Sequence, residues 1–445
     1  MKKILFAIYL SCATFLNITY VNAQEPYVVL SDNYNTLTFY YDNLKSSRNG
    51  MDINVSVEQS GMTYTLPSWY EQCGYITKVV FDESFAGCSS ITTTARWFRG
   101  CLNLKEISNI ANFNTENVID MAGMFGGCIS INKINVSHFN TTKVENMSSM
   151  FESCTGLTSL DLGNFDTQNV TNMGQMFYGC ISLQNINLDS FNTKSVTNMS
   201  SLFGDCRSLN SINLSHFNTS NVTDMGGMFF ACRSLTELHL GNFDTSNVTD
   251  MSQMFGECTQ LKALDLSNFN VEKVENMFLM FSNCSALKSL NVGSFKTKSL
   301  TNLQNTFAGC SSLELLDLSN FDVSNVRQYY WTFKGCSALK TIYSSCNWEN
   351  ELYDFIPIFD SCTSLVGGMG TVFSSDRSSL HYARIDGGQD SPGYFTYKPL
   401  SGIRTISAEV QAPTYYTLDG VKNNNSGKGI RIVKIGDGKI KKVVK

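Results

Sequence analysis

The stretch FDTSNVTDMSQMFGEC (residues 243–258) recurs along the chain with few changes, and its closing cysteine marks the interval. Ten cysteines follow one another at an unbroken spacing of twenty-six, and Cys101 precedes them with one extra residue in between. The ten are Cys128, Cys154, Cys180, Cys206, Cys232, Cys258, Cys284, Cys310, Cys336 and Cys362. Self-similarity with a period of about 20 to 50 residues is typical of a solenoid, whose units bury their apolar faces against their neighbours. The repeat therefore decides the architecture.

Each unit combines a leucine-rich phrase with a second apolar run. After Cys154 the phrase L-x-x-L-x-L-x-x-F ends at Phe165, and its central residues are expected to form a short strand. Val170, Met173 and Met176 follow at steps of three, a spacing that places side chains on one face of a short helix. We therefore expect an α/β fold, a leucine-rich-repeat solenoid with one short strand and one short helix in each repeat.

The repeated cysteines are expected to be buried, small apolar thiols. Stacked strands lie about 4.8 Å apart, which is within reach of a disulfide. Equivalent residues have parallel Cα–Cβ vectors, however, and a disulfide needs vectors that converge, so thiols are favoured. No C-x-x-C occurs and no histidine alternates with the series, which argues against a metal site. Cys73 and Cys88 could pair with each other, and whether these two or Cys346 form disulfides stays open.

Residues 1–23 are typical of a secretory signal peptide, with Lys2 and Lys3, an apolar run over residues 4–16 and a small-residue cleavage pattern ending at Ala23. The run is shorter than the roughly 20 residues of a spanning helix, so we expect no transmembrane span in the mature chain. A lipid anchor at Cys12 is the open alternative. Residues 24–400 hold 22 Lys+Arg against 35 Asp+Glu, and residues 401–445 hold 9 against 3. The acidic body argues against nucleic acid as a partner.

A polar column is the first candidate binding surface. The residue between the last two leucines of each phrase is predicted to face outward on the concave side of the solenoid, where such proteins bind ligands. These positions are Asn135, Asp161, Asn187, Asn213, His239, Asp265, Asn291 and Asp317. The alternative is that the short side chains only cap polar groups of neighbouring strands and keep the face soluble.

An aromatic patch near the end of the repeats is the second candidate. It comprises Arg327, Tyr329, Tyr330, Trp331 and Trp348. Aromatic residues with an arginine are typical of contact hot spots. They are also typical of a last unit that covers the open end of the apolar column, and both interpretations stay open.

Catalysis is not expected. The sequence has no nucleophile elbow, no glycine-rich phosphate loop and no H-E-x-x-H helix. His216 and His239 lie in adjacent units and could share a metal ion with Asp265, but histidines on an exposed sheet are usually ordinary surface residues. We therefore expect neither a metal site nor a cofactor.

With the repeat in view, the chain resembles the BspA-like leucine-rich-repeat surface proteins of anaerobic Gram-negative bacteria, whose repeat is similar to LDLSNFDTSNVTDMSxMFxxC. The resemblance covers residues 29–396, with ITKVVFDESFAGC (76–88) similar to the family's N-terminal cap. LVGGMGTVF, HYARIDGG and PGYFT (within 365–396) are similar to its closing segment. The resemblance implies adhesion to host matrix proteins or to other cells, and it assigns no binding residue.

The basic tail carries a separate resemblance. Residues 415–445 are similar to C-terminal sorting domains of the type IX secretion system, small β-sandwiches read by the outer-membrane export machinery. The segment alternates apolar and polar residues around Ile430, Ile432 and Val433 and again at Ile440 and Val443, as strands do. A frayed basic tail, the alternative, would lack this pattern.

These features predict a signal peptide (1–23), an N-terminal cap (24–100), leucine-rich repeats (101–366), a C-terminal cap (367–400) and a small all-β domain (401–445). The expected protein is secreted or displayed on the outer-membrane exterior, where it binds a protein or glycan on host or neighbouring cells. The alternative is a structural or self-associating surface protein without a dedicated ligand, and a secreted hydrolase is less favoured. The ligand, the binding face and the oligomeric state stay open.

Overall fold

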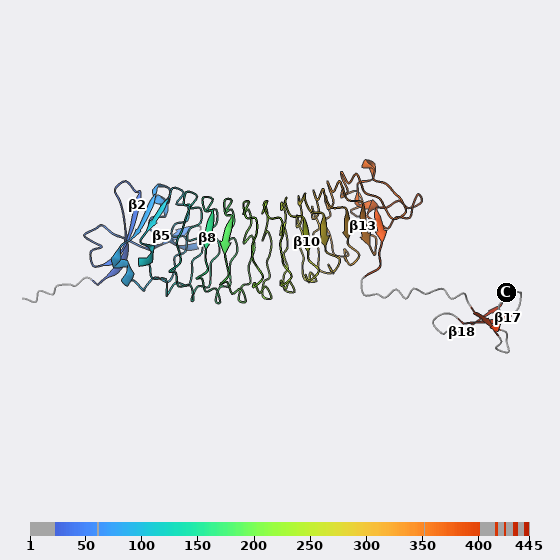
Figure 1. Cartoon of the computed structure of the whole chain (residues 1–445), viewed down its shortest axis with the longest axis horizontal. Helices are drawn as coiled ribbons and strands as arrows, with labels where there is room; N and C mark the ends of the chain where they lie inside the picture. The colour runs from blue at the N-terminus through green and yellow to red at the C-terminus, as the bar shows by residue number, and fades with distance from the viewer. Residues whose placement is uncertain are drawn as a thin grey trace, which may run out of the picture.

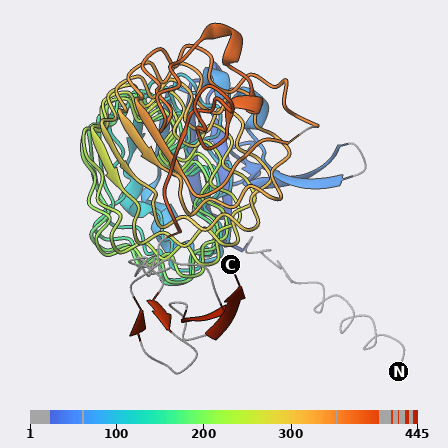
Figure 2. The same cartoon turned by 90° about the vertical axis from the view of Figure 1, so that its right-hand side faces the viewer.

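The computed structural model describes residues 23–59, 62–350 and 352–400, together with four short strands beyond them. These residues form a long row of stacked coils (Figure 1). Viewed along the row, the coils follow one common outline (Figure 2). This arrangement agrees with the predicted repeat solenoid. The predicted signal peptide lies outside the described residues, and among the described ones no helix is long and apolar enough to cross a membrane.

The N-terminal end is a mixed five-stranded sheet in the order β3-β1-β2-β6-β7. Its strands are β1 (Glu25–Leu30), β2 (Thr36–Asp42), β3 (Met51–Asp52), β6 (Lys78–Phe81) and β7 (Glu106–Ser108). β1 pairs antiparallel with β2 and β3, whereas β2, β6 and β7 pair in parallel. The parallel ladder of the solenoid thus already starts within the segment predicted as a cap.

A two-stranded hairpin projects from this end. Its strands, β4 (Asn54–Gln59) and β5 (Met62–Pro67), pair antiparallel with each other and with no other described strand. Figure 2 shows it standing out from the coils on the side away from the repeat strands. Three short 3-10 helices also lie near this end, η1 (Tyr70–Tyr75), η2 (Glu83–Gly87) and η3 (Ile110–Asn112).

Short parallel strands stack along one side of the repeats. The strands are β8 (Ser159–Asp161), β9 (Asn185–Asn187), β10 (Ala263–Asp265), β11 (Ser289–Asn291) and β12 (Leu315–Asp317). Residues that pair with each other are separated by one repeat, as Leu160 and Ile186 are. The central residue points into the core and its two neighbours point to solvent, so alternate leucines are buried.

The short helix predicted in each repeat is wrong. A second parallel ladder of β-bridges runs through this part of the coils, and consecutive turns follow it. After Asn172, the N–H groups of Met176 and Tyr178 bond to carbonyls three residues back, while those of Gln175 and Phe177 bond to Ser200 and Leu202 of the next coil. A chain of turns that close over three residues gives the same apolar spacing as a helix, which explains the misreading.

Each of these turn chains needs two residues with left-handed backbone. In the coil that ends at Cys154 they are Ser149 and Ser153, both with φ of 55°. Other coils have glycine at the second position, for example Gly179 with φ of 73°. Glycine adopts this conformation without a Cβ clash, whereas other residues lose about 1 kcal/mol or more there. Bonds to the next coil make up this cost.

Several columns of side chains fill the inside of the coils, and two of them run through nearly every coil. One is a stack of phenylalanines that runs from Phe98 to Phe359, with ring centroids 5.4–6.0 Å apart. The other is the cysteine series, in which each thiol from Cys128 to Cys362 donates to a phenylalanine carbonyl of the preceding coil at 3.0–3.2 Å. These cysteines are free thiols and buried, as predicted, and burial raises the pKa of Cys180 to about 12.

In most coils, a buried threonine joins the coil to the next through two hydrogen bonds. Thr219 Oγ1 donates to the carbonyl of Asp244 at 2.8 Å and accepts from the N–H of Asp244 at 2.8 Å. The same pair of bonds occurs at Thr115, Thr141, Thr167, Thr193 and Thr297. Valine occupies this position at 271 and 323, where neither bond can form.

The C-terminal end closes the ladder with strand β14. β13 (Thr341–Ser344) pairs in parallel with β12 and with β14 (Phe395–Tyr397), and the 3-10 helices η4 (Ser375–Arg377) and η5 (Leu380–Tyr382) lie between β13 and β14 in sequence. Buried Asp386 accepts hydrogen bonds from the N–H groups of Met369, Thr371 and Gly388, which holds the closing loops together.

The tail contains strands at both places where its alternation predicts them, and two further strands before these. β15 (Thr414–Tyr416), β16 (Lys422–Asn423), β17 (Ile430–Lys434) and β18 (Ile440–Val444) form an antiparallel sheet in the order β16-β15-β17-β18. This pairing agrees with a small all-β unit, and the sorting role of that unit stays a prediction.

Candidate functional site

The predicted polar column exists as a straight, exposed row, here called the strand column. Its members are Asn135, Asp161, Asn187, Asn213, His239, Asp265, Asn291 and Asp317, and all but the half-buried Asp317 are exposed. Neighbouring coils join through it, since Asn187 Nδ2 donates to Asp161 Oδ1 at 2.9 Å. Asn291 donates in the same way to Asp265 at 2.8 Å.

Most members of the strand column also hold the turn that follows each strand. Asp161 Oδ1 accepts from the N–H of Gly163 at 3.0 Å, and Asp265 Oδ1 accepts from the N–H of Ser267 at 3.0 Å. The backbone and hydroxyl of Ser267 lower the pKa of Asp265, so this carboxyl stays ionised. The column is therefore ordered and polar, with a carboxylate at three of its eight positions, and part of its hydrogen-bonding capacity already serves the fold.

The predicted aromatic patch divides into a buried part and an exposed part. Tyr329 and Trp348 are each 1% exposed, so including them in a contact surface was wrong. Trp348 stacks on Phe321 with ring centroids 6.3 Å apart and thereby covers the end of an aromatic column. The interpretation as a terminal unit holds for these two residues because a cut column of rings needs an apolar cover.

The accessible part of the patch comprises the exposed Tyr330 and the half-buried Trp331, with the half-buried Lys334 beside them. The two rings lie 4.4 Å apart, and Lys334 Nζ sits 3.7 Å from the Trp331 ring centroid. Arg327 donates to the carbonyls of Ser324 and Val326 and so partly serves the local backbone. A cation over a tryptophan ring is a pre-assembled contact of about 0.5–1 kcal/mol at an exposed site.

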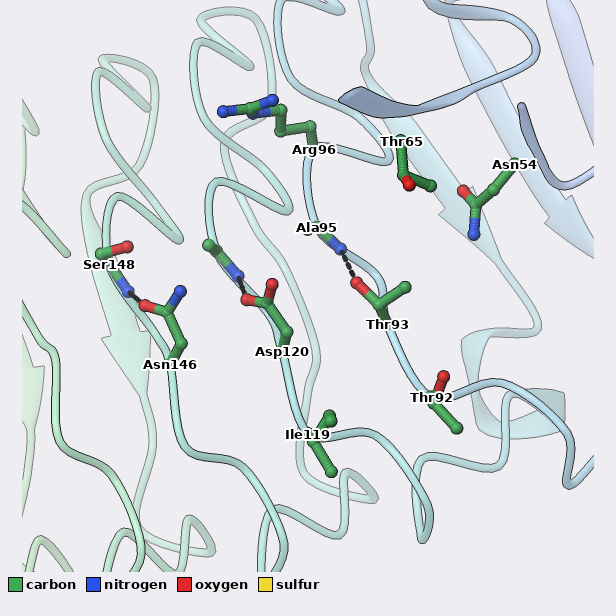
Figure 3. Close-up of a pocket in the computed structure, with 11 residues that line it drawn as sticks. Asn54, Thr65, Thr92, Thr93, Ala95, Arg96, Ile119, Asp120, Asn146 and Ser148 are labelled. Carbon is green, nitrogen blue, oxygen red and sulfur yellow. Dashed lines mark hydrogen bonds between the residues drawn. The ribbon is translucent and has the colours of Figure 1, made fainter. Parts of the chain in front are cut away.

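A polar groove lies at the other end of the repeats, where the sequence did not predict a site. We call it the N-terminal groove; its volume is about 570 Å³. Figure 3 shows Asn54 and Thr65 of the β4–β5 hairpin facing Thr93, Asp120 and Asn146 of three successive coils. The hairpin is thus one wall and the coils are the other.

The coil wall belongs to the second parallel ladder, whose residues form the bridge column. This column runs through Thr93, Asp120, Asn146, Asn172, Asn198, Asp224, Asp250, Asn276, Asn302 and Gln328. Asn172 lies near the midpoint, in sequence, between Asp161 and its equivalent Asn187 in the next coil, so the bridge column and the strand column lie about half a coil apart. Further along this column, burial and the neighbouring carboxylate of Asp250 raise the pKa of Asp224.

Backbone hydrogen bonds fix the polar groups of the groove. Asp120 Oδ1 accepts from the N–H of Ala122 at 2.9 Å, and Asn146 Oδ1 accepts from the N–H of Ser148 at 3.1 Å, as Figure 3 shows. Asp120 Oδ2 and Asn146 Nδ2 have no partner among the described residues. One acceptor and one donor therefore remain available on adjacent coils.

Two further groups border the groove without partners in the described part of the chain. The guanidinium of Arg96 is exposed and makes no ion pair there. The hydroxyl of Thr65 on the hairpin is also unpaired. Each is a polar group that water or a ligand can satisfy.

The histidine pair that the sequence offered as a metal site does not form one. His216 Nε2 lies 2.9 Å from the carbonyl oxygen of Leu188 and so serves the neighbouring coil. Within the described ranges, no three histidine, cysteine, aspartate or glutamate side chains come together in a way that could hold a metal ion.

The sequence does not predict the groove, because it identifies the hairpin segment only as part of the N-terminal cap. A signal was present, since NVSVEQSGMTYTLP (54–67) alternates in the manner of two strands around Ser60 and Gly61. The alternation predicts the hairpin, but its position beside the coils depends on contacts distant in sequence. Asp120 and Asn146 carry no local mark that separates them from the rest of their column.

Comparison with known proteins places the repeats in a family. Two solved structures resemble the chain at low identity, a leucine-rich cell surface protein from Faecalibacterium prausnitzii A2-165 and a leucine-rich repeat protein from Eubacterium ventriosum ATCC 27560. The first is 18% identical with a TM-score of 0.37, and the match covers 76% of this chain and 91% of that one. The second is 17% identical with a TM-score of 0.40, covering 81% and 91%. These scores are too low to transfer either protein's properties to this chain.

No curated protein matches the sequence significantly. A family model described as "Mycoplasma protein of unknown function, DUF285" matches three overlapping segments, residues 82–160, 155–264 and 235–348. Together the segments span residues 82–348, more than half of the chain, and they coincide with the stacked coils. The chain belongs to the DUF285 family.

Proposed function

We propose that this protein is an exported surface adhesin that binds a protein or glycan partner on host or neighbouring cells and carries out no catalysis. The single observation that carries the proposal is the strand column, an exposed polar row that a rigid scaffold holds in register over many coils. A surface held in this way loses little conformational entropy when it binds, because its side chains are already ordered. The motif resemblance to BspA-like surface proteins and the apolar N-terminal run give further support.

The strand column suits a broad partner better than a small molecule. Its free groups are spread along the solenoid at intervals of about 4.8 Å per coil, so each contributes a weak contact over a large area. Exposed positions beside it, such as Ala263 and Ser289, are small and leave the face open. An extended partner can therefore lie along the strands.

A pull-down with the mature chain (residues 24–445) and a panel of matrix proteins tests the proposal. A double variant, Ala263→Arg with Ser289→Arg, blocks the strand side without touching the hydrogen bonds of the column. Thr197→Arg with Thr223→Arg is the matched control on the side of the bridge column, where both threonines are exposed. We expect the first variant to lose capture and the second to retain it. If the unmodified chain captures no partner, the adhesin proposal fails.

A self-associating surface protein is the second candidate, and one observation favours it. Leu352 and Phe355 at the C-terminal end are 76% and 78% exposed, and Met369 and Val372 are exposed as well. Large apolar side chains rarely stay in water without a partner when several occur near one end of a protein. Light scattering over a range of protein concentrations separates the two candidates, since Phe355→Ser should abolish any polymer and leave ligand capture unchanged.

A further inference from the structure

The N-terminal groove has a feature that the rest of the bridge column lacks. Over most of the solenoid this column is an open face, but at Asp120 and Asn146 the β4–β5 hairpin supplies a second wall. The volume of this partly open groove, about 570 Å³, is within the range of roughly 300–1,000 Å³ typical of small-ligand sites. The hairpin therefore lets the groove contact a compact ligand from two sides, which the coil face alone cannot do.

The unpaired groups of the groove suit a ligand rich in hydroxyls. Asp120 Oδ2 accepts, Asn146 Nδ2 donates, and the hydroxyls of Thr65 and Ser148 can do either. A hydroxyl group is at once a donor and an acceptor, so neighbouring hydroxyls can satisfy such a mixed set. The backbone bonds to Asp120 and Asn146 fix their orientation, which lowers the ordering cost of binding.

A peptide ligand fits the same groove less well. An extended peptide pairs with a free strand edge or places side chains in apolar pockets. Here the coil backbone is already paired, since the N–H of Met121 bonds to the carbonyl of Asn146 and that of Gly123 to the carbonyl of Ser148. The apolar lining consists of Ile119, Ala95 and Ala122, which offer a shallow surface without a deep pocket.

We propose that the N-terminal groove is a binding site for a short saccharide, held through its hydroxyls by the bridge column on one side and the hairpin on the other. Ile119, 45% exposed, gives the C–H face of a sugar ring an apolar surface to lie on. The inference rests on the proposed role as a surface adhesin and adds to it a second site, about half a coil from the strand column.

The test uses the mature chain and an array of neutral and uronic-acid oligosaccharides, followed by titration of the strongest responder. Asp120→Asn keeps the Oδ1 acceptor for Ala122 and turns the free acceptor into a donor, so it should weaken binding about tenfold. Thr65→Val removes one hydroxyl from the hairpin and should weaken binding several-fold. Asp224→Asn is the matched control, because Asp224 has the same turn, accepting from the N–H of Gly226 at 2.8 Å, four coils away.

Equal unfolding midpoints for all three variants show that binding and not folding has changed. Thr65→Val provides a second safeguard, since Thr65 belongs to the β4–β5 hairpin, which pairs with no other described strand, and not to the coils. The inference is overturned if no saccharide binds, if Asp224→Asn weakens binding as much as Asp120→Asn, or if matrix-derived peptides compete for the groove. If the saccharide proposal fails in one of these ways while the strand side still captures a protein, the adhesin proposal stays intact. Failure of one proposal can therefore be distinguished from failure of the other.

Discussion

The middle coils and the two ends of the molecule are made of similar residues, yet they differ in what they leave unpaired. In the middle, the buried threonine, cysteine and phenylalanine of a coil find their partners in the neighbouring coils. At the N-terminal end, Arg96 borders a groove without an ion pair among the described residues. At the C-terminal end, Phe355 is exposed. The repeat thus provides partners for the side chains of the middle coils, whereas unpaired polar groups and exposed apolar side chains occur at the ends.

The difference has a physical cause. A contact repeated at every coil stabilises the stack, and the stability of such a stack is close to a sum over neighbouring units. The same repetition makes each coil equivalent, so it cannot by itself mark one place for a specific ligand. Specific sites are therefore expected where another element interrupts the repeat. The β4–β5 hairpin does this at the N-terminal groove.

The largest effect on stability is expected when one ring is removed from the middle of the phenylalanine stack. Phe229 is fully buried, with its ring centroid 5.8 Å from Phe203 and 5.9 Å from Phe255. Phe229→Ala leaves a cavity between two coils and should lower the free energy of unfolding by about 3–5 kcal/mol. Urea denaturation measures the change. Tyr330→Ala at the exposed end is the control and should stay within about 0.5 kcal/mol, and equal losses for both would show that the stack is not the source of stability.

The second largest effect on stability is expected at the buried threonines that join the coils. It can be tested by removing one hydroxyl and by adding another. Thr219→Val keeps the shape of the side chain but leaves the N–H and the carbonyl of Asp244 without their partner, at a cost of about 1–3 kcal/mol. Val271→Thr restores a hydroxyl where the repeat lacks one and should leave stability unchanged or raise it slightly. The comparison of the two unfolding midpoints checks the hydrogen-bond argument, which a loss of similar size for Val271→Thr would contradict.

Much of the structure of the middle coils could be predicted from the sequence, because every coil repeats the same sequence pattern. The regular spacing of the cysteines predicts the stack, and the leucines at alternate positions predict the strands, as Leu160 and Ile186 confirm. The turns that replace the expected helix could not be separated from it, since both give apolar steps of three. The choice depends on hydrogen bonds such as Gln175 N–H to Ser200 O, which exist only once the next coil is in place.

The ends could be predicted less well because they depend on contacts distant in sequence. Trp348 is buried because Phe395 packs against it, with ring centroids 5.2 Å apart, from a strand that comes much later in the chain. The N-terminal groove likewise needs the hairpin at Asn54 and Thr65 to stand beside coils at Asp120 and Asn146. No local pattern encodes either approach.

A smaller effect is expected at the C-terminal end and depends on pH. Burial opposes the ionisation of Asp386, but hydrogen bonds from Thr371, Gly388 and Met369 outweigh it and lower its pKa below the usual value. A folded pKa below the unfolded value of about 3.9 stabilises the fold above that pH, and this stabilisation is lost as the pH falls through the folded pKa.

Asp386→Asn should therefore lower stability by about 1–2 kcal/mol at pH 7, because one oxygen that accepts two N–H groups is replaced. The difference from the unmodified chain should shrink as the pH falls below about 3.9 and through the lowered folded pKa of Asp386, where the unmodified chain also loses the carboxylate. Thermal unfolding at pH 7 and pH 3 measures both values. A difference that stays constant over this range would mean that the carboxylate charge has no part in holding the closing loops.

The smallest effect on stability is expected at the exposed thiol of Cys346. Its reactivity should distinguish this end of the molecule from the middle coils. Cys346 is exposed, whereas the other cysteines of the described residues are buried, and burial raises the pKa of Cys258 to about 12. Partial burial also raises the pKa of Cys346, but access decides its rate, since a reagent can reach it without opening a coil. A maleimide reagent should label one thiol quickly, and Cys346→Ser should remove that labelling while changing stability by less than about 0.5 kcal/mol. Rapid labelling of several thiols in Cys346→Ser would show that the coils open readily, and the rigid surface on which both proposed binding sites depend would then be lost.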